Sequence, residues 1–156
     1  MIDIESMHYE IDSLQPEDLP DIMDVERASF ARPWPEKAFV AEFENPYSRF
    51  LGVRHDGRVV AVLLYWLILP EIHIPSLGVH PNHRRRHLAT WLLQALLEVG
   101  REIQASQIDL EVREHNKAAQ RLYESMGFVR VGMRKGYYED TGETAFLYSY
   151  YYEKQE

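Results

Sequence analysis

The sequence of 156 residues contains no cysteine. This absence excludes disulfide bonds, thiolate metal sites and a cysteine nucleophile, so acyl transfer by this chain has to proceed without a cysteine acyl-enzyme. Long apolar runs are also missing, because the longest, at residues 59–69, has about half the length that a membrane-spanning helix needs. The first five residues are acidic and lack the apolar core of a signal peptide. We therefore expect a cytoplasmic protein that does not insert into a membrane.

Positive charge is scarce as well. The 17 Lys and Arg residues against 25 Asp and Glu residues give a net charge of −8, which would repel a phosphate backbone and argues against general nucleic-acid binding. A nucleic-acid-binding protein that uses the local basic cluster at 84–86 remains a disfavoured alternative. With 46% hydrophobic residues the chain can build a core, and we expect a single domain over residues 1–156, as a monomer or weak dimer.

Apolar periodicity and turn signals predict strands and helices in a mixed order. Asp56-Gly57 is a strong signal for a hairpin. In the segment 108–113, Ile108, Leu110 and Val112 alternate with polar residues and should share one face of a strand. Strands are expected at 9–13, 50–54, 59–69, 71–79, 108–113, 128–133 and 144–152. Helices are expected from 16 to 30, then at 36–43, 84–99 (closed by Gly100) and 117–126. This order predicts an α/β protein with a central mixed, mostly antiparallel sheet and helices on both faces. Pairing should lapse or bulge at Pro75 in the fourth strand, because proline has no N–H to donate.

Three arginines lead from a strand into the longest predicted helix. A helix start presents backbone N–H groups without partners and the positive end of the helix dipole, which together favour an anion. Arg84, Arg85 and Arg86 add positive charge at this place and point to a phosphate ligand. A solvated basic surface would have the same composition, so that alternative stays open.

Two motifs carry a resemblance to a known family. The segment Arg84-x-x-His87-x-Ala89 resembles the acetyl-CoA pyrophosphate loop of the GNAT acetyltransferases, Arg/Gln-x-x-Gly-x-Gly/Ala, with histidine in place of the first glycine. The stretch 110–128, which contains Leu-Glu-Val-Arg, Asn116, Leu-Tyr and Gly-Phe, resembles the RimI-like branch of that family. That branch acetylates protein N-terminal α-amines.

The resemblance extends over roughly residues 8–150 and implies the GNAT acyl-CoA N-acyltransferase fold. It implies acetyl-CoA as co-substrate and a protein or peptide N-terminus as the acceptor, with a ribosomal protein as one candidate. The acetyl group would pass directly to the amine in a ternary complex.

Two residues are candidates for proton transfer. An amine attacks only as the free base, and a protein α-amine has a pKa near 8, so a base has to remove its proton. The resemblance gives this role to Glu111, whose carboxyl pKa should rise by desolvation within its strand; an ion pair with Arg113 or another cation is the alternative. It gives Tyr123 the task of protonating the departing thiolate, against the alternative of a core aromatic residue.

The resemblance also implies the binding residues. Contacts with the cofactor are expected from Leu77, Val79, Arg84, Arg85, Arg86, His87, Leu88, Ala89 and Asn116. Leu77 and Val79 would act through their backbone, where the splayed strand also offers an N–H to the oxyanion, and as side chains they are expected in the core. Asn116 is equally explained as a helix N-cap.

Three further residues are candidates for substrate binding: Glu26, Tyr137 and Tyr138. Glu26 lies on an otherwise apolar helical stripe, and the alternatives are a frayed helix end or a salt bridge with Arg27. The two tyrosines resemble the pair that gathers the substrate backbone in this family, although tyrosine is also a good strand former.

Histidines raise two more questions. His73, His80, His83 and His87 invite a zinc site, but no recognised ligand spacing is present, and we expect no metal. His87 replaces a glycine, whose backbone tolerates unusual dihedral angles. We therefore expect weaker CoA binding than with glycine, and tighter binding below about pH 6.5, where histidine gains a proton.

Two other functions remain open at this point. One is a GNAT acetyltransferase of a small-molecule amine. The other is a CoA-binding module without turnover, in which His87 spoils the loop.

Overall fold

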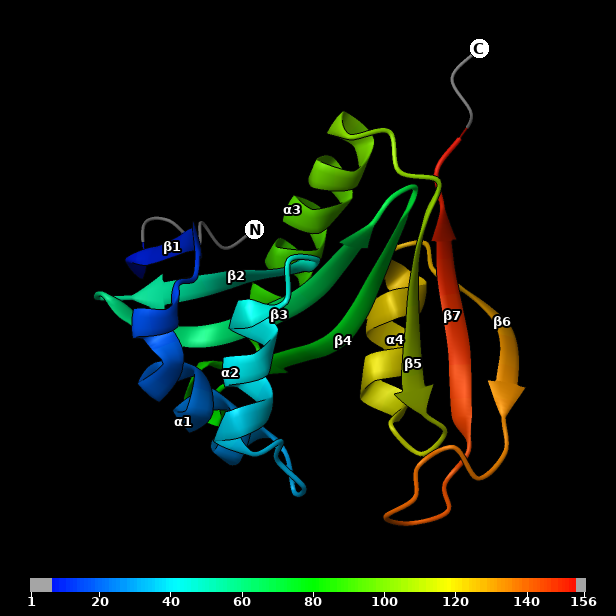
Figure 1. The fold of residues 1–156 in the computed structure, drawn as a ribbon, viewed down its shortest axis with the longest axis horizontal. Helices are drawn as coiled ribbons and strands as arrows, with labels where there is room; N and C mark the ends of the chain where they lie inside the picture. The colour runs from blue at the N-terminus through cyan, green and yellow to red at the C-terminus, as the bar shows by residue number, and fades with distance from the viewer. Residues whose placement is uncertain (1–6, 154–156) are drawn as a thin grey trace. The chain divides into compact units, whose positions relative to one another are not determined.

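A computed structural model describes residues 7–153, and its strands form a seven-stranded sheet in the order β1-β2-β3-β4-β5-β7-β6 (Figure 1). The strands are β1 (Tyr9–Ser13), β2 (Ser48–His55), β3 (Arg58–Ile68), β4 (Glu71–Val79), β5 (Gln107–Arg113), β6 (Val129–Arg134) and β7 (Ala145–Tyr151). The helices are α1 (Leu19–Ser29), α2 (Glu36–Glu44), α3 (Leu88–Glu102) and α4 (Lys117–Ser125), with 3-10 turns η2 (Pro16–Asp18) and η3 (Pro81–His83).

The pairing directions confirm a mixed, mostly antiparallel sheet. β1 with β2, β2 with β3, β5 with β7 and β6 with β7 are antiparallel, and β4 with β5 is parallel. None of the helices in the described part of the chain is long and apolar enough to cross a membrane.

The chain divides into two compact units. The first unit runs to Trp66 and includes Ser76–Ala95, and the second unit holds Leu67–Pro75 and the residues from Leu96 onward. The expectation of a single domain over residues 1–156 stays a prediction.

The first unit has its apolar core between α1, α2 and the strands β2 and β3. Its buried members include Ile22, Val25, Phe39, Phe50 and Leu64. The predicted hairpin at residues 56–57 is confirmed, since both residues have positive φ, +50° and +86°, as a type I′ turn requires.

Two large apolar residues of this unit, Phe30 and Val40, are exposed although they lie within the predicted helices 16–30 and 36–43. Phe30 is the residue after α1 and is 36% exposed, with its ring against Gly78, where an added Cβ would lie 3.0 Å from a ring carbon. Val40 is 41% exposed because it is one residue, about 100° of helical rotation, away from the buried Phe39.

The second unit confirms the alternation that the sequence predicts for β5. Ile108, Leu110 and Val112 are buried, and the polar residues between them lie on the opposite face of the strand. Asn116 caps α4, because its Oδ1 accepts from the backbone N–H of Ala119 at 3.1 Å.

The longest helix differs from its prediction at both ends. It begins at Leu88 rather than at position 84, because Arg85 and His87 have φ of +63° and +60°, which a right-handed helix excludes. It continues past Gly100 to Glu102, so Gly100 does not close it. Gly100 instead gives room to Tyr152, whose hydroxyl would overlap any added Cβ.

Candidate active site

The ladder between β4 and β5 ends within the second unit at a defined rung. It runs from Glu71 opposite Gln107 to Ile74 opposite Leu110. The next residue of β4 is Pro75, which cannot donate, so the predicted lapse in pairing is confirmed. Glu111 is the first residue of β5 beyond the last rung, and on its other side it pairs with Leu147 of β7.

Glu111 is held by a histidine of the neighbouring strand. The Nε2 of His73 lies 2.6 Å from the Oε2 of Glu111, and the two side chains are 27% and 23% exposed. The alternative of an ion pair with Arg113 is therefore wrong, because the side chain at hydrogen-bond distance from Glu111 is that of His73. From the sequence, His73 was a candidate only for a metal ligand, although a histidine in an apolar strand beside the polar face of β5 was a signal for a cross-strand pair.

Arg113 instead binds the loop between β6 and β7. Its guanidinium donates to Asp140 at 3.0 Å and to Glu143 at 3.4 Å, and lies 3.9 Å from the centre of the Tyr138 ring. His115 donates its backbone N–H to Glu143 at 3.1 Å. We call Arg113, His115, Tyr138, Asp140 and Glu143 the arginine clamp.

The clamp fixes the predicted substrate tyrosines against the end of β5. Burial raises the pKa of Tyr138 to about 12, with nearby Arg113 opposing the shift. The hydrogen bond from the His115 backbone, joined by those from its ring and from Arg113, lowers the pKa of Glu143. Tyr137 packs edge-on against Tyr138, with ring centres 5.1 Å apart, and remains 42% exposed. The arginine clamp could not be predicted from the sequence, since its members are up to thirty residues apart.

Tyr123 is buried on α4. It is 8% exposed and packs edge-on against Phe128, with ring centres 5.5 Å apart. Burial raises the pKa of its phenol, with a smaller contribution from Tyr138, so the group keeps its proton at any working pH. Both the proton donor and the core aromatic residue are compatible with this position.

In the first unit, the predicted pyrophosphate loop at residues 84–89 has one side-chain contact to β4 and two residues with positive φ. The side chain of Arg84 donates to the carbonyl of Val79 at 3.3 Å, and that carbonyl also accepts from the hydroxyl of Ser29 at 3.0 Å. Arg85 and His87 are exposed and have a left-handed backbone conformation. His87 directly precedes Leu88, the first residue of α3.

The other loop residues differ in exposure. Arg86 is half-buried, with its guanidinium 6.0 Å from the centre of the Tyr9 ring, and Leu88 is buried in the core. Ala89 is half-buried. The side chains of Leu77 and Val79 are half-buried too, which corrects their expected place in the core.

This loop fits the diphosphate of CoA. Left-handed residues in a turn form a concave row of backbone N–H groups, and the start of α3 adds its own N–H groups and dipole. The exposed arginine side chain at position 85 supplies positive charge at the same place. The donor set therefore suits a polyanion.

Glu26 is buried inside α1. It is 5% exposed, and its Oε2 accepts from the backbone N–H of Trp34 at 2.9 Å. Burial raises the pKa of this carboxyl, and the bond from Trp34 partly opposes the shift. Neither the frayed helix end nor the pair with Arg27 describes it, because the carboxylate fixes the segment between α1 and α2.

Two of the histidines considered for a zinc site, His80 and His83, lie edge-on to each other, with ring centres 6.2 Å apart. The hydroxyl of Tyr9 lies 2.8 Å from the Nδ1 of His83, and the Nδ1 of His80 accepts from the backbone N–H of Asn82. No group of three residues able to hold a metal ion occurs among residues 7–153. That the protein works without a metal stays a prediction.

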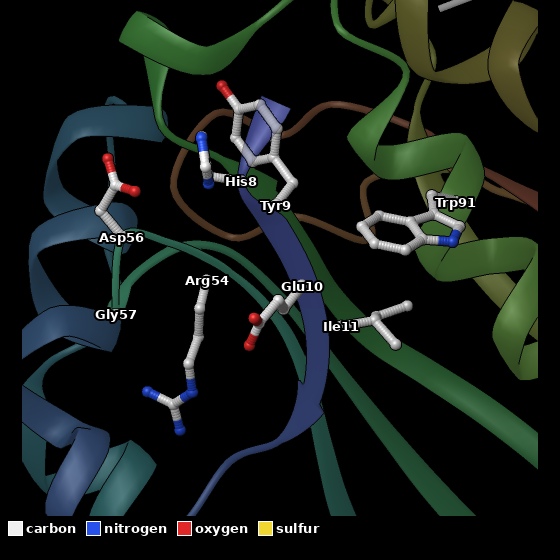
Figure 2. A pocket seen from close by; sticks show the side chains of 8 residues that line it. All are labelled: His8, Tyr9, Glu10, Ile11, Arg54, Asp56, Gly57 and Trp91. Atoms are coloured by element: carbon white, nitrogen blue, oxygen red, sulfur yellow. The ribbon is translucent and has the colours of Figure 1, made fainter. Parts of the chain in front are cut away.

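A pocket of about 530 Å³ lies in the first unit but contains none of the predicted site residues. Figure 2 shows Ile11 of β1 facing Trp91 of α3 on one side of the strand, and Glu10 on the other side. The guanidinium of Arg54 is already bound to Asp12 and Asp18 at about 3 Å. We assign no part of the chemistry to this pocket.

Comparisons with known proteins define the family. The model of the acetyltransferase (GNAT) family matches residues 19–128. The ribosomal protein bS18-alanine N-acetyltransferase of Escherichia coli is 33% identical over 131 residues, which cover 84% of this chain and 88% of that protein. The N-alpha-acetyltransferase RimI of Mycobacterium tuberculosis is 36% identical over 118 residues, 73% of each chain.

The solved structures agree. The crystal structure of the ribosomal-protein-S18-alanine N-acetyltransferase from Escherichia coli superimposes with a TM-score of 0.88, at 29% identity, and covers 95% of this chain and 96% of that one. This chain belongs to the acetyltransferase (GNAT) family. It is an acetyl-CoA-dependent N-acetyltransferase of the RimI-like branch, which confirms the fold, the branch and the co-substrate that the two motifs imply.

Proposed function

We propose that this enzyme acetylates the N-terminal α-amine of a protein, with a ribosomal protein that begins with alanine as its substrate. The observation that carries the proposal is the face of β5 on which Glu111 and Arg113 lie two residues apart. Glu111 is a carboxylate that His73 holds in position for proton transfer. Arg113 anchors the loop that contains Tyr137 and Tyr138. The names of the two similar proteins from Escherichia coli and Mycobacterium tuberculosis support an α-amine as the acceptor.

Glu111 acts as the general base. The attacking amine becomes positively charged as its bond to the acetyl carbon forms, and the carboxylate takes the surplus proton from nitrogen. A carboxylate fixed on a strand is already oriented for this transfer, so no freedom has to be lost at the moment of reaction.

Tyr123 acts as the general acid. Its phenol stays protonated because burial raises the pKa, and it gives that proton to the thiolate that leaves. The proton is then replaced from solvent before the next turnover.

Acetyl-CoA supplies the thioester when it is bound. The loop from Arg84 to Ala89 and the first turn of α3 hold the diphosphate, largely through backbone N–H groups. The backbone of Leu77 and Val79 receives the pantetheine arm as an added strand would be received. Asn116 contributes through the NH2 group of its side chain, since its Oδ1 is engaged as the cap of α4 and its backbone carbonyl accepts from the N–H of Gln120.

Substrate binding involves three side chains. Tyr137 and Tyr138 contact the backbone of the peptide from the loop that the arginine clamp holds. Glu26 contributes through the turn that it fixes at Trp34. A ribosomal-protein substrate would place the enzyme in the cytoplasm, where we propose it acts. A monomeric or weakly dimeric state and the absence of nucleic-acid binding stay predictions.

A peptide panel tests the proposal. Acetyl-CoA is supplied with a peptide that begins with alanine, the same peptide already acetylated at its N-terminus, a lysine-containing control of that blocked peptide, and a polyamine. We expect acetylation of the free α-amine alone, located by tandem mass spectrometry. Turnover of the polyamine with none of the peptides would instead establish the small-molecule acetyltransferase, and tight CoA binding without any turnover would establish a binding module.

A further inference from the structure

The contact between His73 and Glu111 falls on the residue proposed as the base. It joins two polar side chains on adjacent strands at 2.6 Å, in a sheet whose opposite face is apolar at Ile108 and Leu110. We propose that His73 is a positioning residue, which holds one oxygen of the Glu111 carboxylate so that the other oxygen receives the proton of the amine. This inference rests on the proposed role of Glu111 as the base.

The register explains why the contact forms at this place. His73 lies opposite Asp109, on the same face of the sheet as Glu111 two residues further along β5. The last rung of the parallel ladder, Ile74 with Leu110, lies between them along the strands. Because Pro75 follows, backbone pairing no longer fixes β5 from the β4 side at Glu111, and the histidine supplies a side-chain contact just where the ladder ends.

The chemistry of the pair determines its hydrogen bond. An ionised carboxylate can only accept, so the Nε2 of His73 carries the hydrogen and donates it to the Oε2 of Glu111. Bonds to a charged acceptor are short and strong, which agrees with the 2.6 Å separation. During the reaction one proton leaves the amine nitrogen and binds to Oε1 of Glu111, while His73 neither gains nor loses a proton.

Other charged groups on this face have partners of their own. Arg113 belongs to the arginine clamp, with Asp140 at 3.0 Å. Asp109 accepts from the hydroxyl of Ser149 and from the amide of Gln107. His73, in contrast, contacts the proposed base Glu111.

Four variants test the role of His73: His73→Leu, His73→Gln, Glu111→Gln and the double variant His73→Leu with Glu111→Gln. We expect His73→Leu to lower kcat about tenfold, the loss that one hydrogen bond to a charged group represents. The KM for peptide and for acetyl-CoA should change little, because His73 acts through the base. His73→Gln keeps an N–H donor and should retain most of the turnover.

The double variant distinguishes an effect through Glu111 from any other effect. If His73 acts only by holding the carboxylate, His73→Leu should cost nothing further once Glu111 is Gln. A tenfold loss in both backgrounds, an unchanged kcat in His73→Leu, or an equal loss in His73→Gln would each overturn the proposal.

Two controls complete the experiment. Glu71→Gln changes an exposed residue on the same face of β4, two positions earlier, and should leave kcat unchanged. The thermal midpoint of each variant separates loss of turnover from loss of folded enzyme. Full activity of Glu111→Gln alone would refute the base itself, and is a different result from a His73 effect that persists without the base.

Discussion

The two units present their functional groups in different ways. In the second unit the side chains proposed to act on the substrates are held by partners: Glu111 by His73, and Tyr138 by Arg113. In the first unit the loop before α3 exposes Arg85 and His87, and its defining property is the left-handed backbone at both positions.

The two units differ because proton transfer and diphosphate binding have different structural requirements. Proton transfer depends on the position of individual atoms, so a small displacement is costly. Diphosphate binding by backbone N–H groups depends on the path of the chain, and each side chain adds a modest electrostatic contribution. We therefore expect variants of the second unit to change turnover or the peptide KM strongly, and variants of the loop to change acetyl-CoA affinity weakly.

The largest effect is expected for Glu111→Gln. Removal of the general base should lower kcat about 100-fold or more and leave acetyl-CoA affinity nearly unchanged. Steady-state kinetics with an alanine-first peptide and a direct acetyl-CoA titration measure the two quantities. An active variant with the parental pH–rate profile would remove Glu111 from the mechanism.

Tyr123→Phe should have the next largest effect. The substitution deletes only the hydroxyl, so we expect kcat to fall roughly tenfold to a hundredfold while the thermal midpoint stays close to that of the parent. Activity per folded molecule and a thermal melt decide the matter. A midpoint lowered by several degrees with preserved activity would make Tyr123 a core residue only.

Arg113→Met tests the arginine clamp. The change keeps much of the apolar stem but removes the bonds to Asp140 and Glu143, so the loop with Tyr138 loses its anchor. We expect the peptide KM to rise about tenfold, with the KM for acetyl-CoA unchanged. Arg113→Lys is the matched control, because lysine keeps the charge but lacks the planar guanidinium group. Its peptide KM should lie between that of the parent and that of Arg113→Met.

His87→Gly should have the smallest effect, and in the opposite direction. A left-handed conformation costs a non-glycine residue roughly 1–2 kcal/mol, so glycine should raise the thermal midpoint and tighten acetyl-CoA binding a few-fold at pH 8. His87→Asn, which tolerates this conformation better, should show part of the gain. No change in binding would make His87 a bystander, and complete loss would make it an essential contact.

Local patterns predicted those parts of the fold that depend on neighbours in the chain. The alternation in β5 identified its buried residues, Asp56-Gly57 identified its hairpin, and Asn116 identified the start of α4. The start of α3 was predicted four residues early, because the arginines give no local sign of the left-handed turns at positions 85 and 87.

The contacts that hold the site residues in place could not be predicted from the sequence. Glu111 and Tyr123 were identified by a motif, but His73 is 38 residues from Glu111, and only the strand register brings the two together. The clamp likewise joins Arg113 to Asp140 across 27 positions. Pairing of this kind depends on how strands are ordered in the sheet, which apolar periodicity does not specify.

The packing of Tyr152 against Gly100 has a consequence for how the second unit opens. The Tyr152 hydroxyl donates to the carbonyl of Leu97 at 2.8 Å, and its backbone N–H donates to the carbonyl of Ser106 at 3.1 Å. The final turns of α3, the segment before β5 and the end of β7 are thereby joined through one residue, by its side chain to α3 and by its backbone to the segment before β5. Amide hydrogens in these three segments should exchange with solvent as one cooperative group. Tyr152→Ala removes only the side-chain bond to Leu97, so it should release the final turns of α3 as a separate, faster phase.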